Sequence, residues 1–288
     1  EPGKRPAMDR LASTLGPGAT VRPVDLTITP ASSEVGGCTR CGNCFSGCNH
    51  GAKQTLARNL LGEARRHGAH LFTGATVLDV ARDPQDGGWL VHWAFSDPAR
   101  LPARTAPYTL RTRRVVLAAG TFGSTEILMR SQCAGLRFSG QLGHHFSTNA
   151  DVIGAQCELK DAVRGWAREP AAGAESAPGP TITHMVELGR ASANPHVRLV
   201  VEDLTVPAPL GWLFGELMTS LMLPQRWTRF HGARTHAGTA EHTTVDPAAL
   251  DRTLLVAALG HDGAQGRLQL LPGFERARHD GNLTVHWP

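Results

Sequence analysis

The chain has 288 residues, of which 41% are hydrophobic and 19% charged, enough for the core of one large domain or of two smaller ones. Its net charge of +4 is small for this length and no run of Lys and Arg stands out, which argues against nucleic acid as a partner. Six cysteines, most of them clustered, do not make a disulfide scaffold. Reduced thiols or a metal centre in a reducing compartment fit better, so the sequence favours a cytoplasmic location.

The chain opens with Glu1-Pro2-Gly3-Lys4, without a methionine at the first position, and has no signal-peptide pattern. One long apolar stretch, residues 206–224, contains Pro207, Pro209 and Glu216. A membrane span needs about 20 predominantly apolar residues, so we expect no span and leave only a peripheral contact with lipid open.

The first part of the chain reads as a connection followed by a cysteine-rich loop. Residues 1–37 are rich in Pro and Gly and are expected to be irregular, with one extended piece at 21–29. After the loop at 38–53, apolar residues at helical spacing predict a helix over 54–67, which Gly68 ends.

Strand patterns follow this helix. We expect two short strands around a glycine within 70–80 and further strands at 89–95 and 108–112, together a β-meander. The run 114–120 is of the buried parallel type, and a Gly-rich turn leads from it into a helix. Such a joint exposes backbone N–H groups that can meet a phosphate, although many joints of this kind bind nothing.

The second half of the chain has another character. An amphipathic helix is predicted over 210–222, closed by Pro224, either as a core helix or as a lid over a hydrophobic substrate. Strands of a mixed or antiparallel sheet are expected at 197–201, 254–259, 268–271 and 283–287. The predicted fold class is therefore α/β (α+β), with domains at 1–150 and 151–288.

The cysteine-rich loop has the spacing C-x2-C-x2-C-x3-C, which bacterial ferredoxins use to hold iron–sulfur clusters. Three interpretations stay open: an iron–sulfur cluster, a zinc ion, or thiols without metal. Since the fourth cysteine of this run serves another cluster in two-cluster ferredoxins, a remote ligand, Cys133 or Cys157, is an alternative to it. The candidate metal ligands are Cys38, Cys41, Cys44 and Cys48.

Three blocks of the sequence resemble flavoproteins of the glucose–methanol–choline (GMC) oxidoreductase family, most closely its cholesterol-oxidase-like bacterial branch. The first runs from Cys44 through Asn49-x-Gly51-Ala52-Lys53 to Gly74-Ala75-x-Val77. The others are Val116-Leu117-Ala118-Ala119-Gly120-Thr121-Phe122-Gly123-Ser124-Thr125-Glu126 and Leu142-Gly143-x3-Ser147-x-Asn149-Ala150-Asp151.

The resemblance implies a partial Rossmann-like domain for flavin adenine dinucleotide (FAD) and a six-stranded sheet domain that holds a hydrophobic, sterol-like alcohol. It also implies an electron acceptor as partner. Some relatives carry an iron–sulfur cluster at the corresponding loop, whereas the steroid oxidases do not. By match to the family's blocks, the FAD-binding residues are Val77 at the adenine, Ala119, Gly120 and Gly123 at the dinucleotide turn, and Asn149 and Asp151 along the flavin.

Glu202 matches the glutamate that faces the steroid in cholesterol oxidases and moves a proton during double-bond isomerisation. A carboxylate at the end of an apolar strand has a raised pKa if it is buried, as a general base requires. The alternative is a surface Glu-Asp pair formed by Glu202 and Asp203 at a strand end.

Two family features are missing from these residues. There is no G-x-G-x-x-G turn, and there is no His-Pro-x-Gly-Gly or C-terminal Asn-Pro segment with the catalytic histidine and asparagine; Asn194-Pro195-His196 stands in the wrong order. The chain thus resembles the middle of such an enzyme, and we expect residues 1–288 alone to bind FAD poorly and to lack turnover. The competing interpretation is an iron–sulfur electron-transfer or structural module without catalysis of its own.

Overall fold

The computed structural model describes residues 3–30, 36–96, 107–169, 177–211, 213–214, 250–275 and 280–288. The chain divides into two compact units, which are described separately. Unit 1 combines residues 1–64 with 149–261, and unit 2 combines 65–148 with 262–288. The expected boundary at residue 150 therefore differs from the observed division, in which each unit is built from two separate stretches of the chain.

Unit 1 is built on a five-stranded antiparallel sheet in the order β1-β6-β7-β8-β5. The N-terminal segment belongs to this unit because β1 pairs with β6. In this pairing Thr20 lies opposite Glu187. The elements are α1 (Lys4–Leu15), β1 (Thr20–Pro23), β5 (Val152–Gln156), β6 (His184–Leu188), β7 (Leu199–Leu204) and β8 (Leu254–Leu259), with short 3-10 turns η1 (Asn43–Phe45), η3 (Pro195–Val197) and η4 (Ala208–Leu210).

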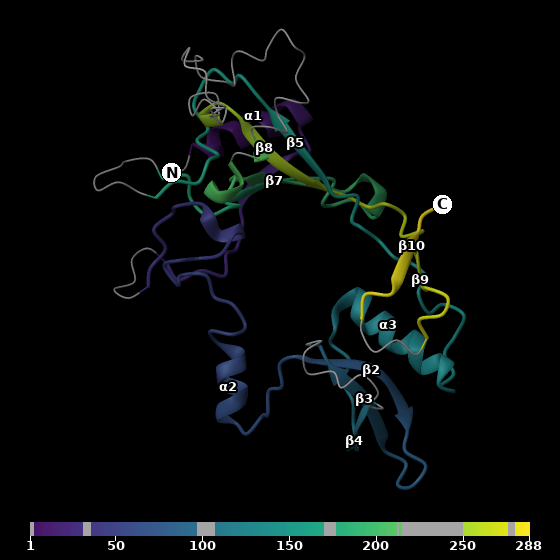
Figure 1. Ribbon diagram of the computed structural model, residues 1–288. Coiled ribbons are helices and arrows are strands. Elements are labelled where there is room, and N and C mark those ends of the chain that lie inside the picture. Colours follow the sequence, from purple (N-terminus) through teal and green to yellow (C-terminus); the bar gives the residue numbers. More distant parts are fainter. Residues whose placement is uncertain are drawn as a thin grey trace, which may run out of the picture. The chain divides into compact units, whose positions relative to one another are not determined.

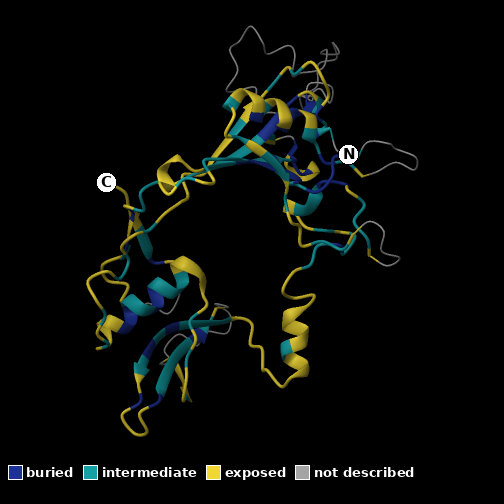
Figure 2. Ribbon diagram, turned by 180° about the vertical axis from the view of Figure 1, so that it is seen from behind, coloured by how far each residue is buried: buried dark blue, intermediate teal, exposed yellow. Residues whose placement is uncertain are grey.

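Helix α1 packs on this sheet and forms the core of unit 1 (Figure 1). Ala7, Met8 and Ala12 of the helix are buried against Val186 and Val201 of the sheet. In Figure 2, dark blue marks the buried residues on the elements of this unit. The expectation that residues 1–37 are irregular is therefore wrong at 4–15: Pro6 is tolerated in the first helical turn, and burial of the apolar face stabilises the helix.

A buried ion pair fixes α1 to the central strand β7. Lys4 Nζ lies 3.1 Å from Asp203 Oδ1, and both side chains are 0% exposed. The ammonium also donates to Thr205 Oγ1 at 2.9 Å and to the Pro180 carbonyl at 3.0 Å. Asp203 in turn accepts from the Thr183 backbone N–H and hydroxyl. Burial lowers the pKa of Lys4 from its usual 10.5, while the Asp203 charge opposes that shift.

Unit 2 contains the predicted β-meander, with helix α3 packed on its first strand (Figure 1). The Val80 N–H donates to Ser131 Oγ at 2.9 Å, which joins the strand to the helix in a buried contact. The elements are β2 (Ala75–Arg82), β3 (Trp89–Phe95), β4 (Tyr108–Thr112), α3 (Gly120–Cys133) and the antiparallel pair β9 (Arg267–Leu270) and β10 (Leu283–His286). Helix α2 (Leu60–Arg66) spans the division between the units.

A second buried ion pair lies on helix α3 of unit 2. Arg130 Nη2 and Glu126 Oε1 of α3 lie 2.7 Å apart, with side chains 2% and 4% exposed. The Glu126 carboxylate also accepts from the backbone N–H groups of Gly281 and Asn282, at 2.9 and 3.2 Å. One carboxylate thus holds the residues before β10 against α3.

The α+β class and the meander are confirmed, with β3, β4 and β8 at the predicted residues. The parallel-type strand expected at 114–120 is wrong in the described structure: residues 114–119 form no strand, Gly120 begins α3, and Val116 is 88% exposed. A strand needs a hydrogen-bonding partner as well as an apolar sequence. Within 70–80, only one strand forms, from Ala75, and the helix expected over 54–67 is confined to α2.

The predicted helix over 210–222 lies almost entirely outside the described residues. Strands β5 and β6 were not expected from the sequence. No helix in the described part of the chain combines the length and the apolar character needed to cross a membrane.

Replacement of Lys4 by Met should destabilise the packing of α1 on the sheet, because the Asp203 carboxylate stays buried without its partner. Removing one partner of a buried ion pair typically costs about 3–5 kcal/mol, so the free energy of opening of α1 should fall by this order. Hydrogen exchange of the α1 amides, followed by mass spectrometry, measures it. In the control Arg5→Ala, the exposed Arg5–Asp9 pair is lost, which should cost only about 0–1 kcal/mol. Equal effects of the two variants would contradict this role of Lys4.

Replacement of Glu126 by Ala should destabilise unit 2 by about 3–5 kcal/mol, because Arg130 loses a buried counter-charge and two backbone N–H groups lose their acceptor. Urea denaturation monitored by the NMR signals of β2 and β3 measures the change. The matched control is Glu275→Ala, at a carboxylate that is exposed in the same unit and accepts from the Gly273 N–H. A loss below about 1 kcal/mol for both variants would refute the assignment.

Candidate functional site

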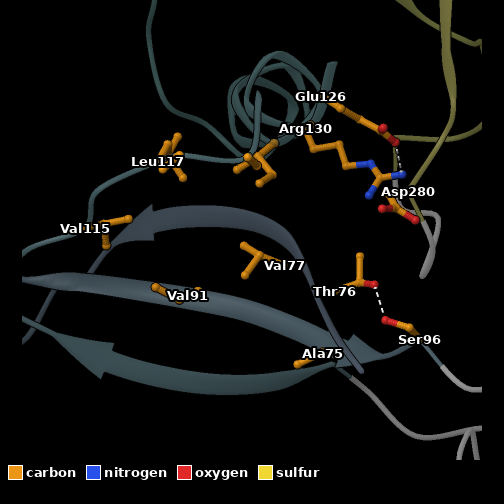
Figure 3. Close-up of a pocket in the computed structure, with 14 residues that line it drawn as sticks. Ala75, Thr76, Val77, Val91, Ser96, Val115, Leu117, Glu126, Arg130 and Asp280 are labelled. Atoms are coloured by element: carbon orange, nitrogen blue, oxygen red, sulfur yellow. Dashed lines mark hydrogen bonds and ion pairs between the residues drawn. The ribbon is translucent and has the colours of Figure 1, made fainter. Parts of the chain in front are cut away.

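A cavity of about 520 Å³ lies within unit 2, between the meander and the start of α3 (Figure 3). Its walls are mostly apolar, and most of its lining comes from β2, β3, the segment before α3, and α3 itself. Small-molecule sites typically measure about 300–1,000 Å³ and combine apolar walls with a few polar groups. The apolar lining includes Val77, Val91, Val115, Leu117 and Ile127.

Val77 stands at an irregularity of β2. The pairing with β3 shifts between Val77, opposite Trp93, and Asp79, opposite His92, so that Leu78 has no partner residue in the register. Such a bulge bends the strand and redirects its side chains. Leu78 is buried, whereas Val77 lines the cavity (Figure 3).

The turn before α3 brings backbone to the cavity. Ala119 and Gly123 line it, and Gly120, the first residue of α3, has φ +72°, a conformation that favours glycine. A Cβ on Gly120 would meet no described atom within 4 Å, so the space beside this backbone is open. The Ala119 N–H donates to Ser124 Oγ at 3.1 Å, which fixes the turn.

Polar groups gather at one end of the cavity, as Figure 3 shows. They are the Glu126–Arg130 pair, Asp280, and the hydroxyls of Thr76 and Ser96, which are 2.7 Å apart. This group was not predicted from the sequence, although Glu126 and Arg130 at i, i+4 in a predicted helix are a recognisable signal.

Asn149 and Asp151 belong to unit 1, at the entry to β5. Asn149 and Ala150 both have positive φ, +59° and +49°, and the Asn149 carbonyl accepts from the Gly260 N–H at 2.7 Å. Left-handed backbone at a residue such as Ala150 is strained and is common at ligand-binding segments. Their predicted contact with the flavin stays a prediction.

Glu202 lies on the central strand β7, with Met185 of β6 and Ala257 of β8 as its partners in register. Val201 and Asp203 are buried on the α1 side, so by strand alternation Glu202 points to the opposite face of the sheet. Its pKa is raised from 4.5, first by burial and then by the charges of Asp203 and Asp151. The structure thus brings two predicted site residues, Glu202 and Asp151, into one electrostatic environment.

The four cysteines of the loop are all free thiols and lie close enough to influence one another. Burial raises the pKa of Cys38. Burial would also raise the pKa of Cys48, but the backbone N–H groups of residues 50–53 outweigh it and lower this pKa. Among the described residues, three metal-ligating side chains, those of Cys41, His50 and Glu169, have ligand atoms that all lie within 4.8 Å of one another. A four-cysteine metal site stays a prediction, and Cys133, an alternative ligand, belongs to unit 2.

The chain matches known proteins over about half its length. Residues 19–148 match the family described as GMC oxidoreductase. A cholesterol oxidase of Acinetobacter baumannii is 30% identical over 171 residues, which are 51% of this chain and 30% of that protein. A cholesterol oxidase of Mycobacterium tuberculosis (strain CDC 1551 / Oshkosh) is 34% identical over 157 residues, 50% of this chain and 25% of that protein.

The chain thus spans less than a third of the length of these curated relatives. The matched region contains the whole meander, the start of α3 and the cysteine-rich loop, together with most of the residues that line the cavity. Residues 19–148 are thus similar to the GMC oxidoreductase family, and the two cholesterol oxidases agree with that similarity.

Proposed function

We propose that this chain is part of an FAD-dependent oxidoreductase that oxidises the CH–OH group of a hydrophobic, sterol-like alcohol. The observation that carries the proposal is the cavity of unit 2, because Val77, Ala119 and Gly123, the residues matched to the FAD site, all line it. The similarity to two cholesterol oxidases supports the class of substrate.

The residues of the cavity fit the adenosine part of FAD. The apolar walls suit the flat face of an aromatic base, and the hydroxyls of Thr76 and Ser96 offer hydrogen bonds at its edge. The open space beside Gly120 admits a ligand close to the backbone, and the first N–H groups of α3 are suited to a phosphate. When bound, FAD supplies the acceptor for the hydride that leaves the alcohol carbon.

The residues matched to the family's FAD site are each proposed to contact one part of the cofactor. The backbone at Val77 recognises the adenine edge, the bulge at Leu78 holds Val77 in place, and Ala119 and Gly120 leave room for the dinucleotide. Asn149 and Asp151 lie along the flavin, and the left-handed backbone at Asn149 and Ala150 is the strained feature that supports this role.

Glu202 is proposed as the group that moves a proton on the substrate. Its carboxylate takes a proton from one carbon and returns it to another, so the double bond shifts without net transfer of electrons. The raised pKa supports this task, because a carboxylate that takes up a proton more readily than usual is a better base, and its protonated form then returns the proton.

Binding of ADP, which carries the adenosine and phosphate part of FAD, tests the cavity. We expect millimolar ADP to shift the NMR signals of Val77 and Gly120, and Ala119→Leu to weaken its affinity by at least about tenfold, since the added carbons fill the site. The control Ala134→Leu adds the same carbons at an exposed position of unit 2 and should leave the affinity unchanged. Equal ADP affinity in both variants would reject the cavity as the adenosine site.

Titration of Glu202 by carboxyl NMR tests the proton-transfer role. We expect its pKa above 4.5 and closer to 4.5 in Asp151→Asn, which removes a neighbouring negative charge. Because the folded pKa is raised, protonated Glu202 stabilises the fold at low pH, and this stabilisation is lost as the pH rises through the folded pKa. The control Asp161→Asn removes an exposed carboxylate paired with Arg10 and should not move the Glu202 pKa. A Glu202 pKa at or below 4.5 would contradict the proposal.

A further inference from the structure

The cysteine-rich loop meets a second segment of unit 1 in a cluster of three different metal-ligating groups. His50 Nε2 lies 3.0 Å from Glu169 Oε2, although 119 positions separate them in the sequence. The ligand atoms of Cys41, His50 and Glu169 all lie within 4.8 Å of one another. Cys41 is 8% exposed, so a buried thiol faces a half-exposed imidazole–carboxylate pair.

The chemistry of the three groups selects the metal. A thiolate, an imidazole and a carboxylate are all ligands of Zn²⁺, whereas Mg²⁺ and Ca²⁺ prefer oxygen ligands alone. In a tetrahedral zinc site, with bonds of about 2.0–2.3 Å, neighbouring ligand atoms stand about 3.4–3.6 Å apart, so shifts of about 1 Å complete the site. The thiolate and the carboxylate together neutralise the charge of the ion.

The backbone around the cluster is held from several sides. The Arg168 N–H donates to the Cys41 carbonyl at 2.9 Å, which places the next residue, Glu169, beside the loop. Gly42 has φ +87°, and a Cβ there would lie 2.7 Å from Thr205 Cγ2, so only glycine allows the loop to approach this closely.

The Glu169 side chain is held in the same way. Asn43 Nδ2 contacts Glu169 Oε1 at 3.5 Å, while Asn43 Oδ1 accepts from the Ala208 N–H at 2.9 Å. Partners of this kind orient ligands in metal sites.

We propose that Cys41, His50 and Glu169 bind one Zn²⁺ ion, with a fourth position open to water. The ion joins the cysteine-rich loop to the segment around residues 165–169, and its binding releases the thiol proton of Cys41 to solvent. This assignment uses one cysteine of the loop instead of four. It does not depend on FAD, since all three ligands belong to unit 1 and the cavity belongs to unit 2.

Metal titration of the reduced, metal-free chain tests the site. Zn²⁺, added in competition with a chromophoric chelator, should bind in a 1:1 ratio. His50→Ala and Glu169→Gln should each weaken binding by more than about tenfold, since even residues that only orient ligands change affinity by about 10–100-fold. The control Cys133→Ser removes an exposed thiol of the other unit and should leave the affinity unchanged.

Substitution of Co²⁺ for Zn²⁺ counts the thiolates. The thiolate-to-cobalt absorption should have the intensity of one sulfur ligand, disappear in Cys41→Ser, and persist in Cys38→Ser and Cys44→Ser. Glu169 is half-exposed, so Glu169→Gln keeps the test valid even where Cys41→Ser fails to fold, which circular dichroism reports.

Three results would overturn the proposal: no binding of Zn²⁺, Zn²⁺ affinity unchanged in both His50→Ala and Glu169→Gln, or a centre that needs all four loop cysteines. Iron together with acid-labile sulfide in the anaerobically purified chain would indicate such a four-cysteine centre and would overturn the zinc proposal.

Discussion

The buried contact between Lys4 and Asp203 is the interaction on which unit 1 depends. It joins the N-terminal helix to the central strand, and the same ammonium holds Thr205 and the carbonyl of Pro180. Thr205 packs against Gly42, beside Cys41, and Asp203 is the sequence neighbour of Glu202. The candidate base and the proposed metal ligand thus both lie next to residues that this desolvated pair holds, and the loss of either partner leaves the other charge buried and unpaired.

Unit 2 also contains a buried ion pair, and this one lies beside the cavity. Glu126 and Arg130 lie at the wall of the cavity, and the carboxylate also fixes the chain before β10. A polar network at the edge of an apolar cavity gives a ligand one preferred orientation, because only the polar end of the ligand satisfies it. The ion pair that stabilises this unit therefore also lines the cavity that we propose as the adenosine site.

Some of this structure could be predicted from local patterns, and some could not. Strands β3, β4 and β8 have β-forming residues between turn signals, and they form at the predicted positions. Helix α1 was missed because Pro and Gly around it obscured Met8, Leu11, Ala12 and Leu15, which recur at i, i+3, i+4 and i+7. The segment 114–120 has the sequence of a strand but no described strand beside it, and periodicity says nothing about partners. The Cys41–His50–Glu169 cluster depends on a tertiary contact that no spacing rule contains. Val77 and Ala119, which the resemblance singled out, both line the cavity, and their contact with FAD stays a prediction.

The chain passes from unit 2 to unit 1 after Thr148 and returns to unit 2 at Asp262. Asp262 accepts from Ser147 Oγ and the Thr148 N–H at 2.9 and 2.7 Å, so the two stretches of unit 2 end side by side. Within unit 1, the Gly260 N–H donates to the Asn149 carbonyl at 2.7 Å, so the two ends of residues 149–261 also lie close together. Residues 149–261 are therefore an insertion with adjacent ends, the arrangement in which domain insertion and circular permutation are tolerated. Joining Thr148 to Asp262 through a short linker would give unit 2 as one continuous polypeptide, with the cavity and its polar end in a single small protein.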